Sequence, residues 1–182
     1  MKYGPFFVKN KNGQEIELRN AEIADAENLI AYLKKTSEET PYLIREPQEI
    51  TIIPEQEEEF IQQIIDSPKE LMLLAFVNGK HAGNCSLMNM GGYHRYAHRC
   101  SVAIALYKDY CGEGIGKLMM ESVLHVAKEF GYEQAELEVM SKNDIAVALY
   151  KKLGFKIYGT LPNNMKYKDG SYDDAYWMMK KL

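Results

Sequence analysis

Apolar positions repeat along this chain with two different periods, which separate predicted helices from predicted strands. Apolar residues spaced three and four positions apart predict helices over 24–35, 54–65, 115–130 and 146–153. Short runs rich in β-branched or aromatic residues predict strands over 3–8, 14–19, 71–77, 81–88, 99–106, 135–139, 156–161 and 173–180. The Asn-Gly pairs at 12–13 and 78–79 predict tight hairpin turns. Strands and helices therefore come first, an antiparallel meander follows in the middle, and the chain ends in a β-α-β-α-β-β order.

The segment 37–53 breaks this pattern. It has no clear period and contains Pro41 and Pro47, so we expect a loop or a short broken helix. No repeat, low-complexity tract or linker divides the rest of the chain, and its 182 residues suit one domain with a sizeable core. We therefore expect a single α/β (α+β) domain over 1–182, with 1–15 as an N-terminal strand extension.

The segment 110–117 links a predicted strand to a strongly periodic helix. Glycine at the alternate positions Gly112, Gly114 and Gly116 lets the backbone turn tightly and approach a ligand closely. Free amides at a helix start, together with the positive end of the helix dipole, suit a phosphate or pyrophosphate. Two familiar nucleotide motifs do not match. A Walker loop needs Ser or Thr at position 118, where this chain has Leu118, and a dinucleotide fingerprint needs a small residue at position 117, where it has Lys117. The glycines alone leave the identity of the ligand open.

A second motif follows at 143–155. It has the form Asn-x-x-Ala-x-x-Leu-Tyr-x-x-x-Gly-Phe and contains a helix that Asn143 caps and Gly154 ends. With the x-Gly-x-Gly-Ile-Gly-Lys loop before it, this motif makes the chain resemble the GNAT superfamily of acetyl-CoA-dependent N-acetyltransferases, from about Ile16 to the C-terminus. The resemblance implies a central mixed, mostly antiparallel, twisted sheet flanked by about four helices. One departure is Cys111, where the family usually carries Arg or Gln, but backbone amides should still hold the pyrophosphate.

The same resemblance implies how the co-substrate acetyl-CoA is held. Main-chain groups of Ile104, Ala105 and Leu106 would pair with its pantetheine arm as an added strand would. Asn143 would lie near the cofactor, and its role as a plain helix cap is an equally good interpretation. The backbone amides that would bind the pyrophosphate are those of Gly112, Glu113, Gly114, Ile115, Gly116 and Lys117.

Acetyl transfer to an amine needs a general acid, a general base and a positioned amide donor. In similar enzymes the tyrosine of the second motif points at the thioester sulfur, so Tyr150 is the predicted acid, and core packing is the alternative role. Glu138 is the predicted base, acting through water as in members that acetylate protein N-terminal amines, and burial on an inner strand would raise its pKa. A structural carboxylate at Glu138, with an ordered water as the base, is the alternative. The strand 99–106, where other members carry their base, has no carboxylate.

Composition narrows the other classes of function. A net charge of −4 and a pI of about 5.6 argue against a global basic field for nucleic acid. Cys85, Cys100 and Cys111 cannot pair completely and have no metal-ligand spacing, which favours a reduced, cytoplasmic protein. The histidines also lack ligand spacing, so no metal is expected. No apolar run reaches the ~20 residues of a membrane span, and the N-terminus does not begin a secretory signal.

We therefore expect an N-acetyltransferase that moves an acetyl group from acetyl-CoA to a primary amine of a small molecule or peptide, by direct attack in a ternary complex. A catalytically degenerate acyl-CoA-binding module and an unrelated phosphate-binding domain are the alternatives, and a homodimer is left open. The glutamates within 55–59 indicate a solvated helix start rather than a site for a cationic substrate. The acceptor is unassigned: segments 37–53 and 162–172 would shape its site, with candidate contacts Tyr42, Arg45, Tyr93 and Tyr167.

Overall fold

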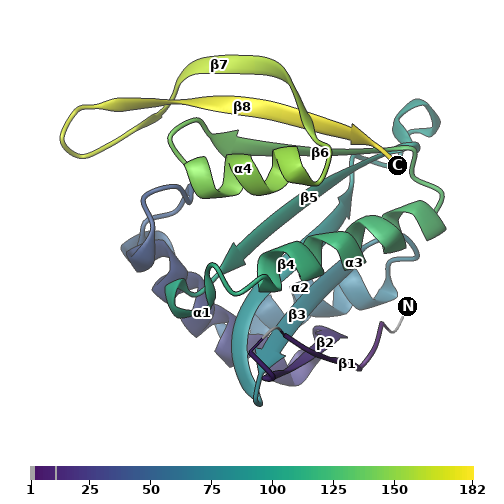
Figure 1. Ribbon diagram of the computed structural model, residues 1–182. Coiled ribbons are helices and arrows are strands. Elements are labelled where there is room, and N and C mark those ends of the chain that lie inside the picture. The colour runs from purple at the N-terminus through teal and green to yellow at the C-terminus, as the bar shows by residue number, and fades with distance from the viewer. Residues whose placement is uncertain (1–2, 11) are drawn as a thin grey trace.

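The computed structural model describes residues 3–10 and 12–182, which contain one mixed sheet of eight strands (Figure 1). Met1, Lys2 and Lys11, which belong to the predicted extension 1–15, lie outside the described residues. Across the sheet the strands follow the order β1-β2-β3-β4-β5-β6-β8-β7. Their bounds are β1 Phe6–Lys9, β2 Glu15–Asn20, β3 Leu71–Val77, β4 Lys80–Asn89, β5 Arg99–Leu106, β6 Gln134–Met140, β7 Lys156–Lys166 and β8 Tyr172–Lys181.

Within the described sheet, β5 and β6 are the one parallel pair, and the other neighbouring strands are antiparallel. A parallel neighbour requires a crossover, and a helix between β5 and β6 supplies it. Antiparallel neighbours need only tight turns. At the β3–β4 turn, Asn78 and Gly79 both adopt positive φ, 48° and 77°, as the predicted Asn-Gly hairpin requires. The predicted mixed, mostly antiparallel sheet is confirmed.

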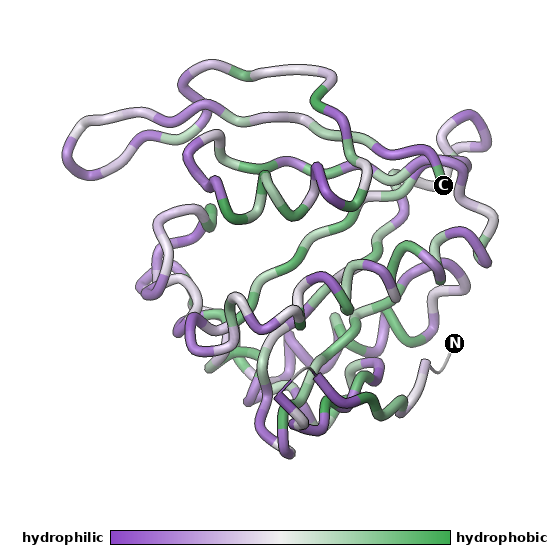
Figure 2. The backbone as a smooth tube through the Cα atoms, in the orientation of Figure 1, coloured by the Kyte–Doolittle hydropathy of each residue, from purple (hydrophilic) through white to green (hydrophobic). Residues whose placement is uncertain are grey.

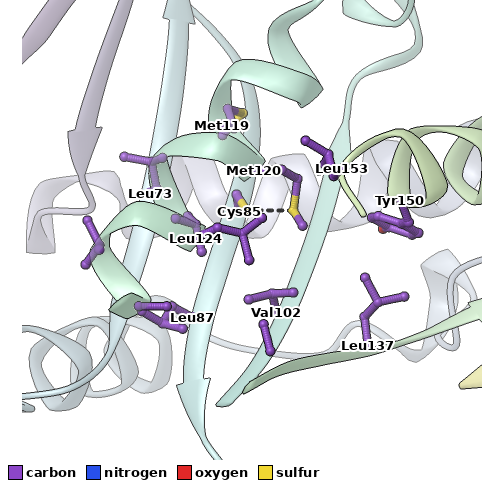
Figure 3. Packing of buried hydrophobic residues seen from close by; sticks show 14 of the residues in the cluster. Leu73, Cys85, Leu87, Val102, Met119, Met120, Leu124, Leu137, Tyr150 and Leu153 are labelled. Atoms are coloured by element: carbon purple, nitrogen blue, oxygen red, sulfur yellow. Dashed lines mark hydrogen bonds between the residues drawn. The ribbon is translucent and has the colours of Figure 1, made fainter. Parts of the chain in front are cut away.

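Two pairs of helices cover opposite faces of this sheet. Helices α3 and α4 pack with inward residues of β3 to β6 in the larger core cluster, part of which appears in Figure 3. Helices α1 and α2 pack on the other face, against β3 residues such as Met72 and Leu74. None of the helices in the described chain is long and apolar enough to cross a bilayer. The helix bounds are α1 Ala26–Glu39, α2 Pro54–Asp66, α3 Ile115–Glu129 and α4 Asp144–Lys152.

Several predicted boundaries differ from the observed ones, two of them by four residues or more. The first helix runs to Glu39 instead of 35; it stops there because Pro41 holds Thr40 in an extended conformation, with φ −142° and ψ 140°. The last hairpin is also longer than expected, since β7 continues to Lys166 through Pro162. Proline is tolerated there because β7 is an edge strand, where a missing N–H breaks no ladder. The loop predicted over 162–172 therefore shrinks to the tip of this hairpin, which is mostly hydrophilic (Figure 2).

Candidate functional site

The parallel strands β5 and β6 pair over three residues only and then diverge (Figure 1). Pairing covers Arg99 to Ser101 on β5 and Gln134 to Glu136 on β6. Beyond these residues, β5 pairs with β4 alone and β6 pairs with β8 alone. The facing edges of 102–106 and 137–140 are therefore left without a strand partner in the described chain, and a wedge-shaped gap opens in the sheet.

An ion pair holds the two strands together where the gap begins. Arg99 donates from Nε and Nη2 to the two carboxylate oxygens of Glu136, at 2.5 and 2.7 Å. These hydrogen bonds are the main cause that lowers the pKa of Glu136 below its ordinary value. Glu136 is buried, with 6% of its surface exposed, whereas the Arg99 side chain is 25% exposed. The ion pair fixes the point from which β5 and β6 separate.

The β5 edge of the gap presents main-chain groups from alternate residues. Tyr107 donates its N–H to the carbonyl oxygen of Ala82 on β4, and the two-residue alternation of an antiparallel ladder then turns the main-chain groups of Ala105 toward β4 as well. The hydroxyl of Tyr32 also donates to the Ala105 carbonyl, at 2.8 Å. Of the predicted pantetheine partners, Ile104 and Leu106 therefore face the gap with their main chain, and Ala105 does not.

The glycine loop forms the bare N-terminus of α3 beside this edge. Gly112 and Gly114 adopt φ of 80° and 85°, values that L-residues rarely take. Gly114 is the N-cap residue, no side chain caps the helix, and the Leu118 N–H is the first to bond within it, to Gly114 O. The amides of the first turn, 115–117, therefore have no partner in the helix. This arrangement can bind an anionic group.

Gly116 brings the loop, β5 and α4 together. A Cβ at Gly116 would lie 3.4 Å from a Leu106 methyl group and 3.7 Å from methyl groups of Ile104 and Leu149. The start of α3 thus packs directly on the part of β5 that borders the gap. Of the other predicted loop residues, Lys117 is exposed and pairs with Glu121, and Glu113 accepts a hydrogen bond from Asn12 in the β1–β2 turn.

Tyr150 lies on α4, on the same face of the sheet as α3. It is buried, in ring contact with Phe155 and in one core cluster with Val102 and Leu137 from the two sides of the gap (Figure 3). Burial raises the pKa of Tyr150 above its ordinary value, and Cys85 adds to this. Within 3–10 and 12–182, no group hydrogen-bonds with the Tyr150 hydroxyl. Both predicted roles, packing and proton donation, are compatible with this position.

Asn143 performs the capping role predicted for it. Its side-chain oxygen accepts a hydrogen bond from the Ala146 N–H at 3.3 Å, at the start of α4. Asn143 directly follows the loop after β6, so it borders the open end of the gap.

Glu138 lies on β6 but points to the opposite face from Tyr150, because Leu137 and Val139 take the α3–α4 face. It is exposed, so the desolvated carboxylate expected on an inner strand is not found. Its two oxygens accept hydrogen bonds from the Trp177 indole N–H at 2.8 Å and from the Asn164 amide at 3.1 Å. Sequence reasoning missed both partners, although the presence of a single tryptophan in the chain was an available signal.

The candidate acceptor residues are only partly brought together. Tyr42 lies at the open end of the gap, where its hydroxyl bonds with the carbonyl oxygen of Lys142. Tyr167 is near the same place, since the Lys142 ammonium lies 5.9 Å from its ring. Arg45 lines a cavity beneath α1 and α2. Tyr93, which is 79% exposed, shares no contact with these residues.

A family model described as Acetyltransferase (GNAT) family matches residues 36–155. The chain belongs to the GNAT family. A curated GNAT relative, the N-alpha-acetyltransferase of Sulfurisphaera tokodaii, is 29% identical over 178 residues, 97% of this chain and 99% of the relative. The L-amino acid N-acetyltransferase AaaT of Escherichia coli is 26% identical over 122 residues, 65% of this chain and 73% of the relative.

Solved structures agree with this membership. A GNAT-family acetyltransferase from Streptococcus pneumoniae has a TM-score of 0.87 and 32% identity, over 92% of this chain and 99% of that one. A Salmonella typhimurium structure that holds its cofactor acetyl-CoA has the same fold, with a TM-score of 0.78 and 17% identity over 92% of this chain and 94% of that one. This GNAT protein is an acyltransferase, as its family and its N-acetyltransferase relatives show.

Proposed function

We propose that this protein transfers an acetyl group from acetyl-CoA to a primary amine, by direct attack in a ternary complex. The observation that carries the proposal is the gap between β5 and β6, which opens beside the uncapped N-terminus of α3. The extended pantetheine arm of acetyl-CoA can pair with a strand edge only where no other strand occupies that edge. The pyrophosphate at the end of the arm needs free backbone amides. The two features lie in contact through Gly116 and Leu106.

In this proposal the chain's own groups divide the binding work. Amides of the loop from Gly112 to Lys117 hold the pyrophosphate, which can approach the backbone closely because Gly112 and Gly114 have no side chains; their positive φ is a conformation that favours glycine. Main-chain groups of Ile104 and Leu106 hold the pantetheine arm along the β5 edge. The relatives named N-alpha-acetyltransferase and L-amino acid N-acetyltransferase support an amine as the acceptor.

Tyr150 is the proposed donor to the leaving sulfur. Its raised pKa keeps the phenol protonated at neutral pH. An ordinary thiol has a pKa near 8.5, below that of the phenol, so full proton transfer from Tyr150 would be uphill. We therefore assign Tyr150 the stabilisation of the developing thiolate by a hydrogen bond, with the proton arriving from the attacking amine.

Glu138 is the proposed base, because a protonated acceptor must lose one proton before its nitrogen can attack; a second proton leaves the nitrogen after attack and ends on the thiolate sulfur. Glu138 faces the side of the sheet opposite to Tyr150, so an acceptor would enter the gap from that side. Hydrogen bonds from Trp177 and Asn164 fix the orientation of its carboxylate. Cys85, Cys100 and Cys111 are all free thiols, which fits the cytoplasm as the proposed location.

The test is CoA release from acetyl-CoA, measured with a panel of primary amines, amino acids and peptides. We expect release that depends on the amine, and thermal stabilisation by CoA but not by ATP or NAD. Stabilisation by CoA without release for any amine would support the acyl-CoA-binding module. Equal thermal stabilisation by CoA, ATP and NAD would show that the glycine loop is not a CoA-specific site.

A further inference from the structure

A cavity of about 320 Å³ lies between helices α1 and α2 and the sheet, on the face from which the acceptor would enter. Its sheet wall includes Asn84 on β4, which pairs with Ala105 on β5. Because neighbouring strands lie about 4.8 Å apart, the cavity is one strand away from the gap. Most of its wall is apolar, and the residues around it are Leu29, Leu33, Arg45, Ile52, Gln56, Glu57, Phe60, Met72 and Asn84.

Glu57 is a buried carboxylate in this wall. It is 5% exposed, whereas its neighbours Glu55, Glu58 and Glu59 are exposed. The reason is helical spacing: Glu57 lies four residues before Ile61, which is fully buried, and therefore shares the inward face of α2. For Glu57, the predicted solvated helix start is wrong.

The carboxylate of Glu57 has no partner. In the described part of the chain it makes neither a hydrogen bond nor an ion pair. Burial raises the pKa of Glu57, and the charge of Arg45 only partly opposes this effect. The Asn84 amide is also unsatisfied, since its buried Oδ1 has no hydrogen-bond partner. A buried, unpaired carboxylate is unfavourable unless something else supplies a donor or a positive charge.

The contrast between Glu57 and Arg45 indicates which charge a ligand in this cavity would carry. Arg45 is exposed, so water satisfies its guanidinium and it needs no ligand. Glu57 is 5% exposed, so its carboxylate can be satisfied by a donor inside the cavity, either water or the ammonium group of a ligand. The apolar wall around it, including Leu29, Phe60 and Met72, suits methylene groups. The cavity therefore fits an aliphatic chain that ends in a cationic nitrogen.

We infer that this cavity binds the far end of the acceptor, and that the acceptor is a small aliphatic diamine or polyamine whose second ammonium group pairs with Glu57. The inference rests on the proposed function: one nitrogen reacts in the gap while the other is held in the cavity. Glu57 is thus a specificity residue that does not touch the reacting atoms.

The test compares amines that differ only in the second nitrogen. Values of kcat/KM are measured for 1,4-diaminobutane and spermidine against n-butylamine and n-pentylamine. We expect the parent protein to prefer the diamines at least about tenfold, since a hydrogen bond to a charged group is worth about that factor. Glu57→Gln should remove the preference by lowering kcat/KM for the diamines. Glu58→Gln, one position along on the exposed side of α2, is the matched control and should leave the preference unchanged.

Calorimetry of 1,4-diaminobutane binding provides a second measurement, independent of turnover: the parent should bind it, and Glu57→Gln should bind it at least about tenfold more weakly. Equal kcat/KM values of the parent for diamines and monoamines would overturn the inference. An equal fall in kcat/KM for both kinds of amine in Glu57→Gln would also overturn it. A marked preference for peptides over all these amines also overturns it. Absence of CoA release with every amine would instead sink the proposed function.

Discussion

The hydroxyl of Tyr42 donates a 3.0 Å hydrogen bond to the carbonyl oxygen of Lys142, which joins the α1–α2 loop to the loop after β6. Three residues earlier, the carboxylate of Glu39 accepts a 2.7 Å hydrogen bond from the Lys108 N–H, directly after β5. The short segment from Glu39 to Tyr42 therefore crosses the open end of the gap, from the end of β5 to the end of β6. We expect this segment to narrow the opening on the proposed acceptor side.

Removing the Tyr42 hydroxyl should loosen this crossing segment. In Tyr42→Phe we expect the KM of the acceptor to rise about two- to tenfold, the range that one hydrogen bond of about 0.5–1.5 kcal/mol supports. Affinity for CoA should change little, because the glycine loop is not involved. Tyr93→Phe is the control, since Tyr93 is 79% exposed and lies away from the gap. An unchanged acceptor KM in Tyr42→Phe would show that the crossing segment does not limit entry.

Gly114 allows charge and backbone strain to be separated. Apart from its chain neighbours, no atom of the described residues lies within 4 Å of a Cβ built there, and its φ of 85° strains Ala at least as much as Asp, which tolerates the left-handed region better. Gly114→Asp places a carboxylate against the pyrophosphate and should weaken CoA binding far more than Gly114→Ala, which shares the strain alone. Calorimetry with CoA on both variants measures the difference. Equal affinities in the two would mean that the pyrophosphate does not bind at this loop.

Tyr150→Phe keeps the ring and its contact with Phe155 but removes the hydroxyl. Turnover should fall about 10²–10³-fold, the usual cost of removing one hydrogen-bond donor to a developing negative charge, with little change in CoA affinity. The matched control is Tyr132→Phe, because Tyr132 is equally buried but its hydroxyl bonds with the Lys69 carbonyl oxygen. Turnover equal to that of the parent would show that Tyr150 only packs in the core.

Glu138→Gln should depress the rate most at low pH, where the acceptor is protonated and needs a base. The rate should recover as the pH approaches the pKa of the acceptor amine, because the neutral amine then forms without help. Rate profiles against pH for parent and variant, with melting curves beside them, measure this. Parallel profiles would remove Glu138 from the mechanism and favour an ordered water as the proton acceptor.

Glu136→Gln tests the ion pair where β5 and β6 separate. The pKa of Glu136 is lowered by its hydrogen bonds from Arg99, so the charged form stabilises the fold above its ordinary pKa of about 4.3 and this contribution is lost as the pH falls below that value. We expect the variant to lose about 1.5–3 kcal/mol of unfolding free energy at pH 7, and the deficit to shrink below about pH 4.3. Denaturant titrations over this range measure it. Glu133→Gln, an exposed neighbour, should show no such deficit, and a deficit that persisted at low pH would argue against an ionic origin.

Local backbone chemistry accounts for what sequence reasoning predicted well. Three features depend only on residues close in sequence: the Asn78-Gly79 turn, the positive φ of Gly112 and Gly114, and the Asn143 cap. The identities of those residues are therefore enough to predict them. The predicted bounds of β3 and β5 match the observed ones, and β3 is the clearer case because its continuous apolar run ends at the Asn78-Gly79 turn.

The boundary errors came from neighbours that a pattern does not contain. The pattern predicts a strand that ends at Leu161, yet β7 continues through Pro162, because this edge strand has no partner on its outer side. The hydrogen-bond partners of Glu138 were missed for the same reason, since Trp177 reaches it across the β6–β8 pairing.

The sequence by itself determined the family, the order of strands and helices, the glycine loop and the position of Tyr150, because these follow from motifs and periods read within short windows. Tertiary structure alone decided that β5 and β6 separate after three paired residues, that Tyr42 meets Lys142 and that Glu57 is buried without a partner. Each of these depends on groups far apart in the chain, and no local period encodes which distant surface a side chain will face. The acceptor site belongs to this second group, which is why the sequence left its substrate unassigned.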